Sequence, residues 1–148
     1  MYLGLVIMVL SCSGSGDSYP PPGGAPSIRF QNYVELGPGE ATSISVLLTI
    51  RRPEDPTSVS YKVFRARKVA EYSPWKGGVP YEKLSMPPGL DISINPSDFV
   101  AYPKKTYKST MEIKTSPKLP EGEYQLFLEV SFNDERWPGS GWITVNVK

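Results

Sequence analysis

The fold is decided by Pro120-Glu121-Gly122-Glu123-Tyr124-Gln125-Leu126-Phe127-Leu128-Glu129-Val130-Ser131-Phe132. The stretch opens with proline and glycine, which favour tight turns. From Tyr124 to Phe132 every second side chain is large and apolar, the period of a strand that has one face on a core. The sequence therefore predicts a tight corner that leads into a long, half-buried strand.

The same alternation recurs in shorter runs along the chain. Thr42–Arg51 places Ile44, Val46, Leu48 and Ile50 on one face. Further strands are expected at Ile28–Leu36, Ser58–Ala70, Leu90–Asn95, Phe99–Tyr102, Tyr107–Lys114 and Trp142–Val147. The chain has 16 prolines and, beyond its first residues, no run with the apolar spacing of a helix. These features predict an all-β protein, an antiparallel sandwich of about seven or eight strands.

Two places depart from simple alternation. In Ser58–Ala70 the apolar side chains change parity between Val63 and Phe64. Because a shift of one residue reverses every side chain of a strand, a β-bulge or a break is expected there. Asn133–Gly141 is rich in turn-forming residues and is expected to be a hairpin loop with Trp137 at its tip.

The corner at Gly122-Glu123-Tyr124 resembles the tyrosine corner of immunoglobulin-like (Ig-like) folds, in which a buried phenol bonds to nearby backbone. The chain has one cysteine, so the disulfide of true immunoglobulin domains is absent. The turns from Pro87-Pro88-Gly89 through the corner to Val147 also resemble bacterial and archaeal Ig-like modules, including those associated with alpha-galactosidases and those repeated in archaeal surface proteins. The resemblance implies a disulfide-free Ig-like β-sandwich over residues 27–148, with structural roles for Gly122 and Tyr124.

The first residues resemble a lipoprotein signal. Leu3–Leu10 is apolar but shorter than the roughly 20 residues that a membrane-spanning helix needs. Val9-Leu10-Ser11-Cys12 resembles a lipobox, in which the cysteine is lipidated and becomes the new N-terminus. We therefore expect residues 1–12 to be a signal peptide with its lipobox, Cys12 to carry the lipid, and the protein to be extracytoplasmic and anchored to the cell membrane. The alternative is an apolar tail with an incidental cysteine.

Residues 13–26 are expected to be a disordered tether. They combine Ser-Gly-Ser-Gly with Tyr-Pro-Pro-Pro-Gly-Gly, a flexible segment followed by a stiffer one. Fully extended, such a tether reaches about 45–50 Å. One acyl chain binds membranes only marginally, so stable anchoring requires several acyl chains on Cys12 or an uncleaved N-terminal segment.

Composition removes most of the usual catalytic and metal chemistry. Histidine, the commonest general base and metal ligand, is absent, and one cysteine cannot build a zinc site. No nucleophile–base set, glycosidase carboxylate pair or phosphate loop is visible, so no enzyme activity, cofactor or metal is expected. Asp98, or Asp134 with Glu135, is a candidate for Ca²⁺ without the pattern of a calcium loop. A formal net charge of +1 gives no reason to expect nucleic acid, and proline-rich loops without histidine fit a thermophile.

Two groups of side chains are candidates for ligand or partner contacts. The basic group consists of Lys62, Arg65, Arg67 and Lys68. It is either a charged face that discourages edge-to-edge aggregation or a contact for an anionic envelope polymer or lipid headgroup. The aromatic group consists of Tyr72, Trp75 and Tyr81 in the irregular segment Glu71–Pro88, together with Trp137 and Trp142. The rings of Glu71–Pro88 are expected either to plug one end of the core or to form a ligand platform, and Trp137 and Trp142 are further candidates for stacking on sugar rings.

The sequence leaves three functions open. The first is a non-catalytic Ig-like module for contact, adhesion or assembly with an envelope protein. The second is a carbohydrate-binding module whose aromatic rings stack on an envelope polysaccharide. The third is a filament subunit that assembles by strand donation, with the early strand and the tether as donors. Aromatics gathered in loops at one end favour carbohydrate binding, whereas aromatics buried against the core favour protein contact.

Overall fold

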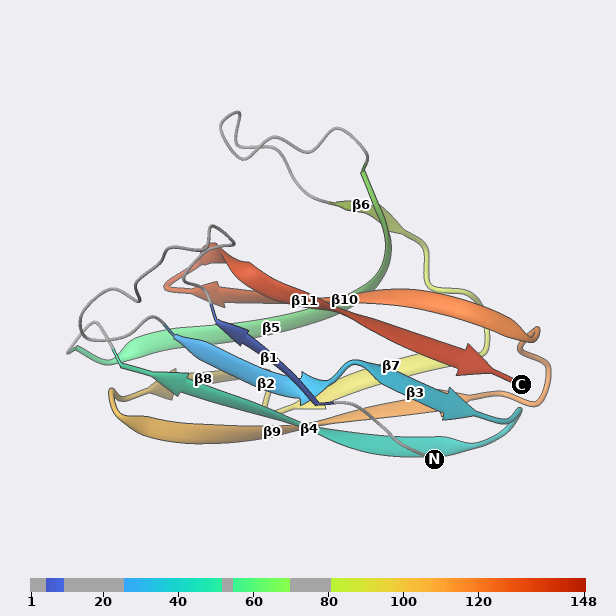
Figure 1. Cartoon of the computed structure of the whole chain (residues 1–148), viewed down its shortest axis with the longest axis horizontal. Helices are drawn as coiled ribbons and strands as arrows, with labels where there is room; N and C mark the ends of the chain where they lie inside the picture. Colours follow the sequence, from blue (N-terminus) through green and yellow to red (C-terminus); the bar gives the residue numbers. More distant parts are fainter. Residues whose placement is uncertain (1–4, 10–25, 52–54, 70–80) are drawn as a thin grey trace.

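All regular structure in the described part of the chain is β-strand, arranged in two facing sheets (Figure 1). The computed structural model describes residues 5–9, 26–51, 55–69 and 81–148, and for 5–9 and 138–140 it describes the backbone alone. Over these residues no helix has the length and apolar character that a membrane span requires. The fold is an all-β sandwich, as the alternation of apolar residues predicts, and it is Ig-like without a disulfide, as the resemblance of the corner implies.

Sheet A has the strand order β1-β2-β4-β9-β7, and every neighbouring pair is antiparallel. Its strands are Leu5–Val9 (β1), Ser27–Gln31 (β2), Ala41–Ile50 (β4), Lys105–Thr115 (β9) and Leu90–Asn95 (β7).

Sheet B has the strand order β3-β11-β10-β5-β6, with β8 paired to β5. Its strands are Tyr33–Leu36 (β3), Glu135–Val147 (β11), Gly122–Phe132 (β10), Thr57–Lys68 (β5), Tyr81–Leu84 (β6) and Asp98–Ala101 (β8). β3 and β11 are parallel, and the other pairs are antiparallel.

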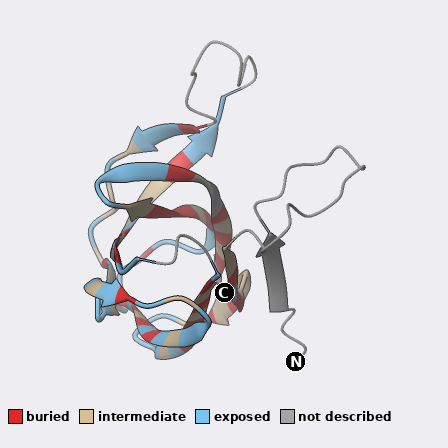
Figure 2. Ribbon diagram, turned by 90° about the vertical axis from the view of Figure 1, so that its left-hand side faces the viewer, coloured by how far each residue is buried: buried red, intermediate tan, exposed pale blue. Residues whose placement is uncertain are grey.

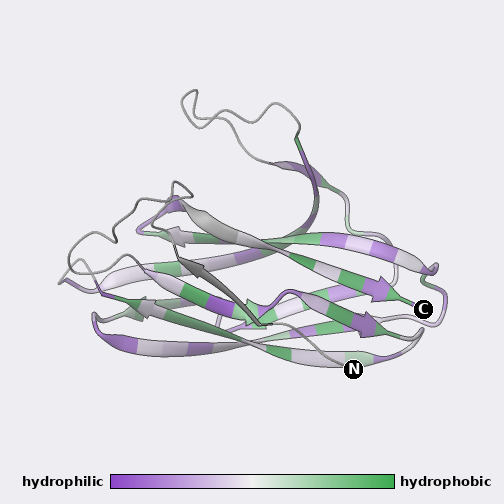
Figure 3. Ribbon diagram, in the orientation of Figure 1, coloured by the Kyte–Doolittle hydropathy of each residue, from purple (hydrophilic) through white to green (hydrophobic). Residues whose placement is uncertain are grey.

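The core lies between the two sheets. Figure 2 shows buried residues interspersed with exposed ones along the strands of both sheets, and Figure 3 shows apolar and polar residues alternating along the strands. β4 buries Ile44, Val46, Leu48 and Ile50, the face that the alternation predicts. β10 turns every second residue from Tyr124 to Val130 toward the core. The longest strands therefore follow the simple period of a half-buried strand.

The single strand predicted over Ile28–Leu36 is wrong, because the chain passes from β2 in sheet A to β3 in sheet B at Asn32. The Asn32 carbonyl accepts a hydrogen bond from the Thr144 amide at 2.9 Å, which holds the crossing against β11. Both halves turn even-numbered side chains toward the same core, so the alternation runs through the change of sheet without a break. With β1 and β6, this split raises the number of strands in the described residues to eleven.

The bulge predicted at Val63–Phe64 is absent. β5 pairs with β10 in an unbroken register from Val59 to Arg65. The parity of the apolar residues changes for another reason. Phe64 and Ala66 pack in a second apolar cluster on the outer face of sheet B, while the preceding apolar residues face the core.

The loop predicted over Asn133–Gly141 is also wrong. β10 and β11 meet at a tight turn in which Asn133 and Asp134 have φ angles of 50° and 66°. Positive φ at two successive residues is typical of hairpin turns, and asparagine and aspartate tolerate it. β11 begins at Glu135 and buries Trp137 in the core at 5% exposure. The proline and glycines that suggested a loop lie at a register shift between β10 and β11.

The corner before β10 holds Tyr124 in place. Its hydroxyl donates a hydrogen bond to the Pro120 carbonyl oxygen at 2.7 Å, and the side chain is 8% exposed. Gly122 has a φ of 142°, which residues with a side chain rarely adopt, although a Cβ there would meet no atom within 4 Å. Glycine is therefore required at this corner for its backbone conformation, and not because a neighbouring atom leaves no room for a side chain.

We expect Tyr124→Phe to lower the free energy of unfolding by about 1–3 kcal/mol, because the Pro120 carbonyl loses its partner in a mostly buried site. Tyr61→Phe is the matched control. Tyr61 is 3% exposed, and among the described residues its hydroxyl has no hydrogen-bond partner, so this change should leave the stability equal or higher. Urea denaturation followed by circular dichroism measures both. Equal effects would show that the corner hydrogen bond contributes nothing.

Candidate functional site

The outer face of sheet B carries a second apolar cluster, here called the outer cluster, formed by Phe64, Ala66, Tyr81, Phe127 and Trp142. In the register of the sheet, Phe127 lies between Phe64 on β5 and Trp142 on β11. The ring centroids of Tyr81 and Phe127 are 4.1 Å apart. The C-terminal half of β5 rises away from the sandwich and carries β6 (Figure 1). The outer cluster therefore braces this β5–β6 ribbon against sheet B.

Glu129 is the acid beside the outer cluster, and it is 8% exposed. The Tyr81 hydroxyl donates a hydrogen bond to Glu129 Oε2. Burial, and then the neighbouring Glu129 carboxylate, raise the pKa of Tyr81 to about 12. The phenol is therefore protonated at neutral pH and remains a donor, so Glu129 fastens the ribbon to the sheet.

Cations lie over the rings of this face. Each is within about 6 Å of a ring centroid, the range of a cation–π interaction. The pairs are Lys83 over Phe64, Lys68 over Trp142 and Arg136 over Tyr81, at 4.5, 5.8 and 5.9 Å from the cation to the ring centroid. The outer face is thus both aromatic and positively charged.

The basic group predicted from the sequence is divided along β5. Lys62 and Lys68 alternate with Arg65 and Arg67, so the two pairs leave the strand on opposite sides. The Arg65 guanidinium lies 5.8 Å from the ring centroid of the corner tyrosine. Arg67 forms an ion pair with Glu82 of β6 at 2.6 Å. The structure does not bring all four cations together in one patch, but Arg67 and Lys68, at the end of the strand, border the same groove.

A groove of about 460 Å³ opens beside the outer cluster. Its lining combines an aromatic ring, two amides, a hydroxyl and two cations, which belong to Trp142, Asn32, Gln125, Thr144, Arg67 and Lys68. Thr144 Oγ1 donates a hydrogen bond to Gln125 Oε1 at 3.1 Å. No carboxylate is among the lining residues, so the groove is electropositive.

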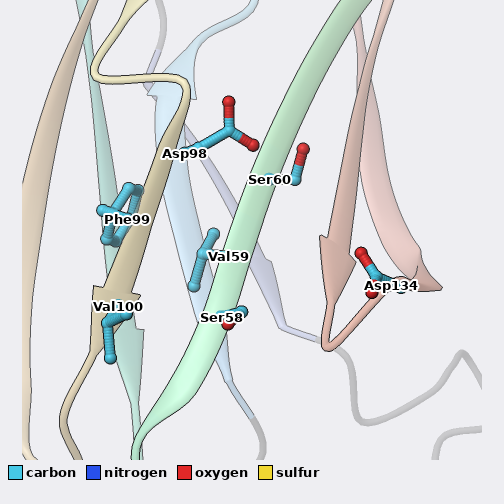
Figure 4. A pocket seen from close by; sticks show the side chains of 7 residues that line it. All are labelled: Ser58, Val59, Ser60, Asp98, Phe99, Val100 and Asp134. Carbon is cyan, nitrogen blue, oxygen red and sulfur yellow. The ribbon is translucent and has the colours of Figure 1, made fainter.

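A second hollow, of about 350 Å³, lies at the other end of β5. Figure 4 shows Asp98 and Asp134 on either side of β5, so their carboxylates do not converge. Within the described ranges, no group of three or more histidine, cysteine, aspartate or glutamate side chains is placed to hold a metal ion. The calcium site considered for Asp98, or for Asp134 with Glu135, therefore has no support from the geometry.

The remaining predicted contact residues differ in outcome. Tyr81 is 4% exposed within the outer cluster and Trp137 is 5% exposed in the core, so neither ring lies open on the surface, and their assignment as contact residues stays a prediction. Cys12, Tyr72 and Trp75 lie outside the described residues, and their roles stay predictions.

Phe127 is the residue of this face that the sequence analysis missed. It occupies a position on β10 where the alternation calls for a polar side chain, and it is 4% exposed. An apolar residue out of step with its strand is the signal that would have found it. Lys83, Gln125 and Thr144 carry no such signal, because polar residues are ordinary on exposed strand faces.

In sequence, the chain matches no known family model and no curated protein. In structure, 78% of it aligns with 22% of a family 123 glycoside hydrolase from Clostridium perfringens, studied for glycolipid glycan hydrolysis, at a TM-score of 0.52 and 12% identity. The chain thus spans about a fifth of that enzyme. A PapD-like domain of human CEP192 aligns over 95% of both chains at a TM-score of 0.47 and 12% identity. The Escherichia coli chaperone DraB aligns over 82% of this chain and 54% of its own length, at a TM-score of 0.43 and 14% identity. These likenesses concern the β-sandwich fold.

Proposed function

We propose that this chain is a non-catalytic, membrane-anchored extracytoplasmic module that assembles with an envelope protein by accepting a strand from it. The observation that carries the proposal is the pairing of β1 with β2. β1 lies within residues 1–12, the segment that the sequence predicts to be a signal peptide. Removal of that segment would turn β2 into an open edge of sheet A.

β2 is suited to bind a strand along the edge that β1 occupies. It pairs with β4 on one side and with β1 on the other, and the β1 register covers β2 from Ser27 to Gln31. Ile28 and Phe30 are 0% exposed and anchor β2 to the core. Without β1, one row of backbone N–H and C=O groups lacks partners, and such an edge is a template for a strand from another chain.

The sequence supports the envelope part of the proposal. The lipobox-like Val9-Leu10-Ser11-Cys12 would release β1 and attach the new N-terminus to the membrane. The tether of residues 13–26, which extends to about 45–50 Å, would present the open edge away from the membrane surface. Tyr81 and Trp137 are buried and not gathered in loops, which favours protein contact over carbohydrate binding through loop aromatics.

We expect protein extracted from membranes to begin at a lipidated Cys12, as measured by intact-mass spectrometry.

We also expect residues 13–148 to bind a peptide of residues 1–10 with a solubilising lysine tail, because the peptide refills the β1 position. Fluorescence anisotropy of the labelled peptide measures this binding. The full chain, whose β2 edge is occupied, should bind the peptide at least tenfold more weakly.

The matched control is the same peptide with Ile7→Pro. Proline has no N–H and a fixed φ, so it interrupts the β1–β2 ladder at its central pair. The proline peptide should bind at least tenfold more weakly than the native one. An unmodified protein that retains Met1 would contradict the anchor, and equal binding of the two peptides would contradict strand addition.

A further inference from the structure

We propose that the groove beside Trp142 binds an acidic saccharide, a sugar chain that carries carboxylate groups. The groove lies on the outer face of sheet B, whereas strand addition uses the β2 edge of sheet A, so this inference goes beyond the proposed function and fails separately from it. Its volume of about 460 Å³ falls within the range of roughly 300–1,000 Å³ that is typical of small-ligand sites.

Trp142 supplies the apolar surface for a sugar ring. Its indole meets Phe127 at 5.0 Å and 74°, and Tyr81 at 6.3 Å and 87°, in edge contacts that fix its orientation. The side chain is only partly buried and borders the groove. The face of an aromatic ring is negative, so it attracts the weakly positive C–H groups on the flat side of a pyranose. Because Trp142 is already fixed, binding costs little side-chain entropy.

Amide groups at the groove match the hydroxyls of a sugar. The hydrogen bond from Thr144 sets the orientation of the Gln125 amide by occupying its oxygen. Among the described residues, nothing accepts a hydrogen bond from Gln125 Nε2, so its N–H groups are available to a ligand oxygen. Asn32 adds a second amide, and its backbone is held in place by β11. The groove thus offers donors beside an apolar platform, as saccharides require.

The charge of the groove selects an acidic sugar. Arg67 is paired with Glu82, so its charge is largely balanced. Lys68 forms no ion pair with a described residue, and its Nζ lies 5.8 Å from the Trp142 ring centroid. A ring stacked on Trp142 would therefore bring a carboxylate on that ring close to the ammonium. Charge-assisted hydrogen bonds are stronger than neutral ones, so a uronic acid is favoured over a neutral sugar.

The test uses the full chain with tetragalacturonate as the probe and maltotetraose as a neutral sugar of equal length. Binding is followed by the indole N–H signal of Trp142 in NMR, assigned with Trp142→Phe. We expect tetragalacturonate to shift this signal, with an affinity that falls as salt rises because Lys68 is exposed. Maltotetraose should bind at least tenfold more weakly. The absence of a shift, or equal affinity for the two sugars, would overturn the proposal.

Variants locate the site. Lys68→Glu should lower the affinity for tetragalacturonate at least tenfold, because it reverses the charge beside the platform. Lys108→Glu makes the same change at an exposed lysine on the outer face of sheet A and should leave the affinity unchanged. Trp142→Ala should also lower the affinity at least tenfold. If Trp142→Ala does not fold, Lys68→Glu still tests the site, because the Lys68 side chain is exposed and its replacement should not disturb folding. Wild-type affinity for tetragalacturonate in Lys68→Glu would contradict the site.

Discussion

Replacing Trp137 by alanine is expected to lower the free energy of unfolding by about 3–5 kcal/mol. Trp137 is 5% exposed and belongs to the main core. Its ring centroid lies 5.2 Å from that of Phe132, and it is opposite Val130 in the β10–β11 register. Alanine would leave a cavity between the sheets near the hairpin, and the cost combines the lost burial with that cavity.

Trp142→Ala is the matched control, with the same side chain removed from the same strand. Trp142 lies on the outer face and is partly exposed, so its loss should cost less, about 1–2 kcal/mol. Urea denaturation followed by circular dichroism measures both variants. A loss below about 1 kcal/mol for Trp137→Ala would mean that Trp137 is not part of the core.

Phe127→Ala is expected to cost about 3 kcal/mol and to release the β5–β6 ribbon. Phe127 is 4% exposed, and its ring centroid lies 4.1 Å from Tyr81, 5.0 Å from Trp142 and 5.9 Å from Phe64. It is the ring that these three side chains share, so its removal loosens the packing of β6 over β10 and β11. Amide hydrogen exchange should therefore accelerate in Tyr81–Leu84 more than in β4.

Val100→Ala is the control for this prediction. Val100 is 51% exposed on β8, which pairs with the other end of β5, so its loss should change the stability by no more than about 0.5 kcal/mol. Unchanged exchange in β6 of Phe127→Ala would show that the outer cluster does not hold the ribbon.

The long strands could be predicted because each buries every second residue. β4 shows this most plainly, with Ile44 to Ile50 facing the core and serine or threonine largely between them. The corner at Tyr124 was also accessible to sequence reasoning, since it depends on residues four positions apart. Local chemistry and a regular period are thus enough for the sandwich itself.

The wrong predictions concern residues whose positions are determined by contacts between segments that are distant in the sequence. The apolar residue Phe64 suggests a shift of strand register when the sequence is read alone. The segment that covers it, β6, is only four residues long and too short to show a strand period. Trp137 was placed in a loop because proline and glycine follow it, although the turn is made by Asn133 and Asp134. The groove could not be predicted, since its lining comes from β5, β10, β11 and the β2–β3 crossing, with no shared motif.

The crossing at Asn32 has a mechanical consequence. β3 follows it directly and runs parallel to the last strand, from Tyr33 beside Thr144 to Leu36 beside Val147. A pull between the N-terminal end of β2 and the C-terminal end of β11 would drag β3 and β11 past each other in opposite directions. Their hydrogen bonds would then share the load and break together, rather than open one at a time. The sandwich is therefore arranged to resist stretching between these two ends.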